Sequence, residues 1–478
     1  MKLLHRALLL LCCLLSNPAP ASANDDLPIL GDPTAALMSA DQEYRLGRAW
    51  LRQLRGQTSI MSDPLIQEYV ESLVYKLASF SDLKEPDLDI VVINSRQINA
   101  FAVPGGVIGL NAGLFLNAED ESEVGGVVAH EIAHVSQRHF ARRYLDSKKV
   151  NTAVLAAMLA SLAIAIAGDG EAGMAGIAAT QAGAIQAQLA YSRQNEREAD
   201  RVGMQTLVSA GMDPGGMPRF FERMHNEKQF SGDPPEFLLT HPVTESRISD
   251  SRARARNLPS PPMTVSPHYL LVQARLRAAF IQGDDQAISY FERYSNERSA
   301  LALQAARYGL ALSHLRANHY DLARSLMEQL AAQYPDELWF RLGLAEVAVD
   351  EEDYPRAIDE ARRVLKISPD DYAASILLSK AYLRSKQPTL ALPVLKPLLN
   401  KRPTDPQIWD LAADAYGNSG DRIRALHARA ESQFLRGNGS KALLQMQYAL
   451  QDAEDDFALY SKLSGRMKTM QRLSEEEF

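Results

Sequence analysis

Two histidines and a glutamate have the spacing of a metal site. The stretch VVAHEIAHVSQRHFARR places His130, Glu131 and His134 in an H-E-x-x-H arrangement. A helix advances about 100° per residue, so His130 and His134 share a face, where two imidazoles can bind zinc while the glutamate acts on the water of the metal. On the same helix His139 would lie about 180° from His130, and it is therefore predicted to point away from the metal.

The histidine pair requires a further ligand, because a catalytic zinc usually has three protein ligands and one open position. In the stretch YSRQNEREAD, Glu196 and Asp200 lie four residues apart and share a helical face. One could bind the metal, and the other could hold a liganding histidine through its second ring nitrogen. The charges of residues 193–201 alone would fit a solvated helix face, and only the upstream H-E-x-x-H favours a metal site.

The segments around these residues are mixed α and β. β-branched runs at 90–93 and 107–110 flank the Pro-Gly-Gly turn at 104–106 and predict a small antiparallel sheet. Beside this turn, residues 99–102 could present a strand edge that holds an extended substrate through main-chain hydrogen bonds. The acidic residues 119–121 suit a helix N-terminus, because carboxylates favour the positive end of the helix dipole.

The second half of the chain is helical and repetitive. A 34-residue period appears in the prolines Pro335, Pro369 and Pro403 and in the alanines Ala323, Ala357, Ala391 and Ala425. This period, with small residues where paired helices touch and proline after the second helix, resembles tetratricopeptide repeats over roughly 304–437. The flanking helical segments suit capping repeats, and a generic helical bundle is the alternative interpretation.

The N-terminus is predicted to be a secretory signal. Residues 1–23 combine the basic Lys2 and Arg6 with a short apolar run and a small-residue cleavage site before Asn24. Cys12 and Cys13, the two cysteines of the chain, both lie within it, so the mature protein would carry no thiol. The net charge of −8, made two units more negative by this cleavage, argues against nucleic-acid binding and favours protein partners.

The stretch 152–193 is alanine-rich and apolar before it is interrupted by glycines. Its apolar part, 153–167, is too short to span a bilayer, which needs about 20 residues. The predicted role is a buried helix followed by a glycine loop, and the alternatives are an active-site lid or a peripheral contact with a membrane surface.

Four ordered motifs in the range of roughly 99–248 resemble the metallopeptidase family of the CAAX prenyl proteases. These are Asn99-Ala100-Phe101-Ala102 with Pro104-Gly105-Gly106, His130-Glu131-x-x-His134, Ser192-Arg193-x-x-Glu196-x-x-Ala199-Asp200, and Thr240-His241-Pro242 with Arg247. Members of this family are gluzincins, whose third zinc ligand is a glutamate. The resemblance thus implies that Glu196 is the third ligand and that Asp200 supports a histidine ligand.

His241 and Arg247 complete the candidate catalytic group with Glu131 and Asp200. A histidine held before Pro242 could hydrogen-bond the tetrahedral oxyanion, or it could bind the metal in place of water and close the site. The closing role is the favoured interpretation, and it leaves Arg247 to help with the oxyanion.

The predicted fold is an α+β zincin-like metallopeptidase domain, mostly helical with a small antiparallel sheet, followed by an all-α tetratricopeptide-repeat solenoid. The proline-rich stretch 257–269 suits the linker. The predicted domains are a signal at 1–23, a zinc metallopeptidase at 24–258 and the repeats at 259–478.

The predicted function is that of a periplasmic zinc endopeptidase with one zinc ion per subunit. The combination of signal, peptidase and tetratricopeptide array resembles periplasmic proteases of Gram-negative bacteria. That resemblance implies quality control of outer-membrane β-barrel proteins, with these proteins and their assembly machinery bound by the repeats and unfolded chains as substrates. Because the mature chain shows no convincing membrane span, a prenylated substrate inside the bilayer does not carry over from the family. The alternative is a chaperone or scaffold that acts mainly through the repeats without proteolysis.

Overall fold

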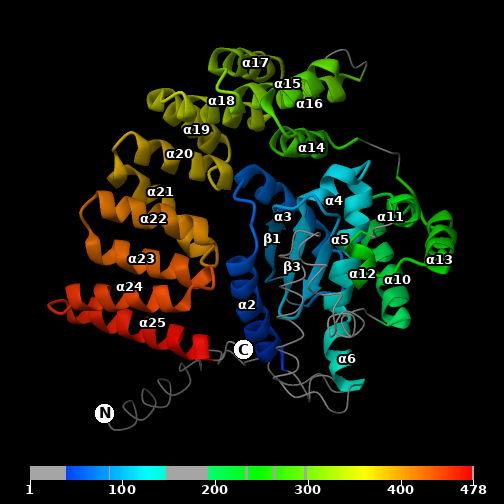
Figure 1. The fold of residues 1–478 in the computed structure, drawn as a ribbon, viewed down its shortest axis with the longest axis horizontal. Helices are drawn as coiled ribbons and strands as arrows, with labels where there is room; N and C mark the ends of the chain where they lie inside the picture. Colours follow the sequence, from blue (N-terminus) through cyan, green and yellow to red (C-terminus); the bar gives the residue numbers. More distant parts are fainter. Residues whose placement is uncertain are drawn as a thin grey trace, which may run out of the picture.

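The computed structural model describes residues 39–84, 87–146, 192–231, 235–261, 265–294 and 299–475. The predicted signal at 1–23 and almost all of the apolar segment 152–193 lie outside these ranges. The described chain has an N-terminal part, residues 40–256, and a helical array, residues 267–475, that curves along one side of it (Figure 1). Within the described ranges, no helix has the length and apolar character needed to cross a membrane.

The N-terminal part is built around a three-stranded sheet. The first two helices and the strands are α2(Ala40–Gln57), α3(Pro64–Ala78), β1(Asp89–Ile93), β2(Ala100–Val103) and β3(Val107–Asn111). The strand order is β1-β3-β2, with β1 parallel to β3 and β2 antiparallel to it. The expected small sheet is present, but its two β-branched runs are parallel neighbours rather than antiparallel ones.

The direction of pairing follows from the turn before β3. Gly105 and Gly106 both have positive φ, 77° and 75°, which allows the chain to reverse between β2 and β3. The hairpin partner of β3 is therefore the short β2, and the chain reverses twice between β1 and β3. Two reversals leave β1 and β3 running the same way, so the sheet is mixed.

Helices surround this sheet. They are α4(Ala112–Asn117), α5(Glu121–Ser136), α6(His139–Asp146), α10(Arg193–Ser209), α11(Gly216–Ser231), α12(Phe237–Thr240) and α13(Glu245–Arg256). Helix α5 is central, because every residue from Glu123 to His134 is buried. It begins where the acidic residues predicted a helix start, with the Asp120 side chain accepting a hydrogen bond from the Glu123 amide.

The array consists of antiparallel helices stacked in the predicted repeat register. They are α14(Pro267–Phe280), α15(Asp284–Arg293), α16(Ala300–Arg316), α17(Tyr320–Gln333), α18(Leu338–Asp350), α19(Tyr354–Ile367), α20(Tyr372–Arg384), α21(Pro388–Lys401), α22(Pro406–Asn418), α23(Arg422–Leu435), α24(Gly439–Asp452) and α25(Phe457–Glu475). Ala323, Ala357 and Ala391 are buried where paired helices meet. Pro335 and Pro369 each follow the end of a helix, as the repeat pattern predicts.

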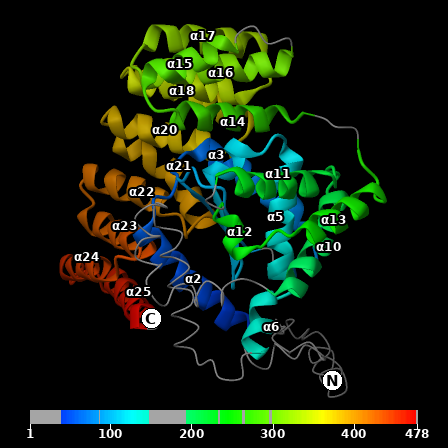
Figure 2. The ribbon, with the colours of Figure 1, turned by 45° about the vertical axis from the view of Figure 1, so that its right-hand side comes forward.

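The array and the N-terminal part share apolar packing. Tyr269 on α14 is buried in the same cluster as the residues of α5, and its hydroxyl donates to the carbonyl oxygens of Phe115 and Ala118 at 3.2 and 3.0 Å. Leu65 on α3 packs with Leu342 and other residues of the array. Figure 2 shows α2 and α3 between the array and the rest of the N-terminal part. The expected boundary at 258–259 falls between α13 and α14, and the core continues across it.

Candidate metal centre

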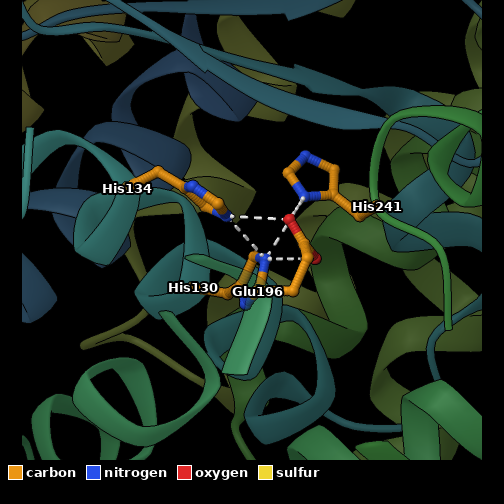
Figure 3. A group of neighbouring side chains, drawn as sticks. All are labelled: His130, His134, Glu196 and His241. Carbon is orange, nitrogen blue, oxygen red and sulfur yellow. Dashed lines mark hydrogen bonds and ion pairs between the residues drawn. The ribbon is translucent and has the colours of Figure 1, made fainter. Parts of the chain in front are cut away.

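Four buried side chains from three segments converge on one point (Figure 3). His130 and His134 come from α5, Glu196 comes from α10, and His241 follows α12. His130 Nε2 lies 3.0 Å from His134 Nε2 and 3.3 Å from His241 Nδ1. Glu196 Oε1 lies 3.4 Å from His134 Nε2 and 3.2 Å from His241 Nδ1.

These separations suit a tetrahedral metal ion. One ligand atom from each of the four residues lies within 4.8 Å of all the others. Four donors at about 2.1 Å from a tetrahedral ion would be about 3.4 Å apart, which is close to the distances above. The chain therefore brings together three nitrogen donors and one carboxylate oxygen as a set that can hold a metal.

The close approach of α10 to α5 depends on a glycine. A Cβ atom added to Gly203 would lie only 2.9 Å from the carbonyl carbon and oxygen of Ala129 and from the amide nitrogen of His130. Backbone atoms cannot yield to such a contact without moving a helix. Gly203 thus allows Glu196 on α10 to reach the histidines of α5.

Replacing Gly203 with alanine should separate the two helices. We expect Gly203→Ala to lower the free energy of unfolding by about 1–3 kcal/mol, because the added methyl group overpacks a buried contact, and to weaken metal binding. Thermal melting and metal titration would measure both effects. Gly417→Ala is the matched control, since its added Cβ meets only Ala425 Cβ at 3.7 Å, and alanine favours the helix by up to about 1 kcal/mol. Equal stability of both variants would contradict this role of Gly203.

Asp200 and Arg247 hold two of the candidate ligands from behind. Asp200 Oδ1 lies 3.0 Å from His130 Nδ1, the ring nitrogen that faces away from the other donors. Arg247 Nε and Nη2 donate to the two carboxylate oxygens of Asp200 at 2.8 and 2.7 Å. Arg247 Nη1 also lies 2.7 Å from Glu196 Oε2. The guanidinium thus pairs with the carboxylates of Asp200 and Glu196 behind the donor set. This placement does not support the expected role of Arg247 in binding the oxyanion.

The charges of these partners act against the effect of burial. Burial would raise the pKa of Glu196, but His241 and Arg247 hold that pKa well below its ordinary value. Burial would lower the pKa of His130, but hydrogen bonds to Asp200 and Glu196 raise it to about 9. For His134 burial prevails and lowers the pKa well below its ordinary value. The carboxylate of Glu196 is therefore ionised, as a metal ligand must be.

Glu131 is buried beside the four donors, and its carboxylate is not satisfied by the described residues. Neither of its oxygens has a hydrogen bond of good geometry among them, although the Ala102 amide is near enough to lower the pKa of this carboxyl group. His241 Nε2 approaches Oε1 at 3.4 Å, and burial raises the pKa of Glu131. A buried carboxylate without a hydrogen bond is costly, and a polar group held at the centre of the donor set would remove that cost.

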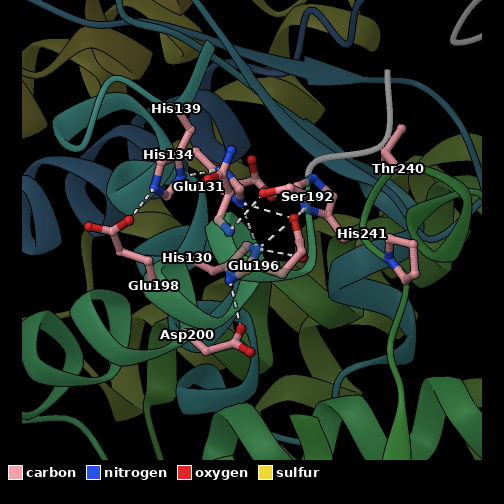
Figure 4. Close-up of polar contacts among 12 residues, drawn as sticks. His130, Glu131, His134, His139, Ser192, Glu196, Glu198, Asp200, Thr240 and His241 are labelled. Carbon is pink, nitrogen blue, oxygen red and sulfur yellow. Dashed lines mark hydrogen bonds and ion pairs between the residues drawn. The ribbon is translucent and has the colours of Figure 1, made fainter. Parts of the chain in front are cut away.

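His139 lies at the site, against the prediction from periodicity. Helix α5 ends at Ser136 instead of continuing through 143, and Arg138 adopts a left-handed φ of 50° before α6 begins. This break turns His139 inward, where it is buried, with Nδ1 3.0 Å from His134 Nδ1 and Nε2 3.3 Å from Glu198 Oε2 (Figure 4). No signal in the local sequence marks the break, because Arg138 is neither glycine nor asparagine.

The segment that carries His241 is fixed by backbone and ring contacts. The His241 amide donates to the Phe237 carbonyl at 2.8 Å, and the imidazole stacks on the Phe237 ring with centroids 5.0 Å apart. The Phe237 amide donates to the carbonyl of Ile98, just before β2, at 3.2 Å. This segment therefore contacts both the donor set and the beginning of an edge strand.

Comparison with known proteins agrees with this architecture. Residues 64–255 match Peptidase family M48, and residues 308–372 and 348–415 match tetratricopeptide repeats. A Vibrio cholerae protein assigned as a β-barrel assembly-enhancing protease is 37% identical, covering 93% of this chain and 92% of its own. The β-barrel assembly-enhancing protease of Escherichia coli is 33% identical, covering 96% and 94%. The mitochondrial metalloendopeptidase OMA1 of Arabidopsis thaliana is 29% identical over 40% of this chain and 36% of its own.

The fold and the site define a metallopeptidase whose peptidase part is joined to a tetratricopeptide array. The similarity to two of these relatives extends over more than nine-tenths of each chain and so includes both parts. The chain belongs to the β-barrel assembly-enhancing protease family, within the M48 peptidases.

Proposed function

We propose that this protein is a periplasmic zinc endopeptidase, with one zinc ion per subunit, that degrades misassembled outer-membrane β-barrel proteins and promotes their assembly. The observation that carries the enzymatic part is the set of four converging donors with the unsatisfied carboxylate of Glu131 beside it. The near full-length similarity to β-barrel assembly-enhancing proteases supports the cellular role.

His130, His134 and Glu196 would hold the ion, with His241 as a fourth ligand that closes the site. Two or three imidazoles with a carboxylate are typical of zinc. Once His241 has left the fourth position, zinc would lower the pKa of a water molecule there and polarise the carbonyl of the scissile peptide bond. Asp200 keeps the His130 ring oriented, and Arg247 positions both Asp200 and Glu196.

Glu131 would be the general base and then the general acid. Its carboxylate takes a proton from the attacking water molecule and transfers it to the leaving amine of the cleaved peptide. Burial favours this exchange, because a raised pKa brings the carboxyl group closer to the operating pH. Among the described residues no hydrogen bond of good geometry fixes its carboxylate, so it can face the water.

The outer edge of β2 would bind the substrate. In the strand order β1-β3-β2, β2 is an outer strand, and an extended chain could add to it through main-chain hydrogen bonds. Main-chain recognition gives weak sequence preference, which suits unfolded chains. The repeats would recruit outer-membrane β-barrel proteins and their assembly machinery. We propose no nucleic-acid partner.

A requirement for zinc through Glu196 tests this proposal. We expect chelation to abolish hydrolysis of an unfolded β-barrel protein by the purified chain and one equivalent of zinc to restore it. Glu196→Ala should weaken zinc binding by about 100-fold or more, which exceeds the roughly 10–100-fold cost of losing a residue that only supports a ligand. The exposed Glu454 provides the control variant Glu454→Ala. Full zinc occupancy in Glu196→Ala would assign the third ligand to another group, and hydrolysis after complete chelation would refute zinc catalysis.

A further inference from the structure

His139 is a buried histidine that the catalytic mechanism does not use. It lies at the first residue of α6, between His134 on one side and Glu198 on the other. Its Nδ1 is 3.0 Å from His134 Nδ1, and its Nε2 is 3.3 Å from Glu198 Oε2. Arg142, one turn further along α6, donates to the same Glu198 oxygen at 2.9 Å. The four side chains form a continuous polar chain from the donor set toward solvent.

In the 3.0 Å contact between His134 and His139, one imidazole must donate the hydrogen bond and the other must accept it. A hydrogen bond between two ring nitrogens needs one N–H donor and one lone pair, since two N–H groups or two lone pairs would repel. His134 presents Nε2 to the other donors, at 3.0 Å from His130 Nε2. A neutral histidine that offers the Nε2 lone pair carries its proton on Nδ1. With its Nε2 lone pair on the metal, His134 is therefore the donor in the contact, and His139 Nδ1 is the acceptor.

The same reasoning extends to the next contact. With its Nδ1 lone pair facing His134, a neutral His139 carries its proton on Nε2 and can donate it to Glu198 Oε2. Glu198 lies on α10 between Glu196 and Asp200, so the acceptor is placed by the helix that supplies the carboxylate of the donor set. The break after α5 is what allows His139 to fit between α5 and α10.

We propose that His139 is a positioning residue for the metal: it holds His134 in the tautomer whose Nε2 lone pair is free to bind, and Glu198 holds His139 in turn. This inference rests on the proposed zinc site and adds a component to it. His130 and His134 are then supported differently. The carboxylate of Asp200 contacts His130 directly, whereas His134 is held by the imidazole of His139, which is itself held by the carboxylate of Glu198.

Two substitutions distinguish the effect of the Nδ1 acceptor of His139 from the effect of the volume of its ring. His139→Asn keeps an oxygen at about the position of Nδ1, whereas His139→Leu fills similar space without an acceptor. We expect zinc binding by the full chain, measured by competition with a chelator, to weaken by about 10–100-fold in His139→Leu and to stay within about threefold of the wild type in His139→Asn. Glu198→Ala, a change at a partly exposed residue that should not impair folding, is expected to weaken zinc binding in the same direction.

The outcomes distinguish this inference from the proposed function. If the wild-type chain binds no zinc, the proposed function fails whatever the variants do. If the wild type binds zinc and His139→Leu binds it equally well, the positioning role is refuted. Equal losses in His139→Leu and His139→Asn would also refute it, because the volume of the ring rather than its acceptor would then matter. Melting curves of the zinc-free variants control for folding.

A spectroscopic measurement on the zinc-loaded chain tests the tautomers directly. In the full chain with ¹⁵N-labelled histidine, we expect the ring-nitrogen shifts of His139 to report a proton on Nε2 and a lone pair on Nδ1. Those of His134 should report a proton on Nδ1. A proton on His139 Nδ1 would overturn the inference even if the His139→Leu variant bound zinc weakly.

Discussion

Glu131→Gln is expected to keep its zinc and to lose peptide hydrolysis by about a hundredfold to ten-thousandfold, the usual contribution of a general base. The amide has nearly the shape of the carboxylate but cannot take a proton from water. The candidate ligands His130, His134 and Glu196 are unchanged, so the metal should stay bound. Metal analysis and kcat/KM for an unfolded protein substrate measure the two halves of this prediction.

A matched variant on the same helix separates catalysis from burial. Glu123 is also a fully buried glutamate of α5, but it pairs with Arg223 at the opposite end of the helix from His134. Glu123→Gln should lower stability while leaving kcat/KM within a few-fold of the wild type below its melting temperature. Retained turnover in Glu131→Gln, with Glu123→Gln behaving normally, would remove Glu131 from the mechanism.

The same Glu131→Gln variant distinguishes the two functional hypotheses in cells. As an enzyme that binds but cannot cleave, it should hold uncleaved clients, which crosslinking and purification from the envelope would identify. If the protein acts mainly as a scaffold through its repeats, Glu131→Gln should support β-barrel assembly as well as the wild type. A failure of assembly with clients still bound would assign the role to proteolysis.

Features that depend on local periodicity were predictable from the sequence. The spacing of His130 and His134, the shared face of Glu196 and Asp200, and the 34-residue repeat each lie within one helix or one helical pair. A helix places residues four apart on one face whatever surrounds it. The motif around His241 needed the family resemblance, because a histidine on a loop carries no periodic signal.

Features that depend on a chain reversal or on distant packing were not predictable. The pairing of β1 with β3 depends on β2, a strand of only four residues, which is too short to give an alternating pattern. His139 was misplaced because a single left-handed residue, Arg138, ends the helix. The contacts of Leu65 and Tyr269 between the two parts join residues more than 150 positions apart, as the Tyr269 hydrogen bonds to Phe115 and Ala118 show. Such placement is decided by the assembled core.

His241 has the contacts expected of a ligand that closes the site. Its Nδ1 lies within 3.3 Å of both His130 Nε2 and Glu196 Oε1, so a metal held by those residues would also meet this imidazole. The segment that carries it donates the Phe237 amide to the Ile98 carbonyl, at the beginning of the strand proposed to bind substrate. One segment would thus obstruct the position of the water and is anchored just before the strand proposed to bind substrate.

His241→Ala is therefore expected to raise basal proteolysis, including self-cleavage, by about tenfold or more. If closure is favoured by a few kcal/mol, the open state is populated at only about 0.1–10%, and loss of the imidazole would make it the main state. An oxyanion role predicts the opposite, a loss of about 100-fold in rate with zinc retained. Hydrolysis of an unfolded protein and the rate of self-cleavage, both measured on the zinc-loaded chain, decide between them.

Two control variants distinguish the closing and oxyanion roles of His241 from a loss of folding. His268→Ala removes a half-exposed histidine that pairs with Glu337 in the helical array, and it should change neither rate. Phe237→Leu keeps the imidazole but removes the ring on which it stacks. Under the closing role this loosens the segment, so basal proteolysis should rise by less than in His241→Ala. Under the oxyanion role both substitutions should slow hydrolysis. Wild-type rates and unchanged zinc affinity in His241→Ala would exclude both roles, because an imidazole that neither binds the metal nor contacts the reacting carbonyl can be lost without effect.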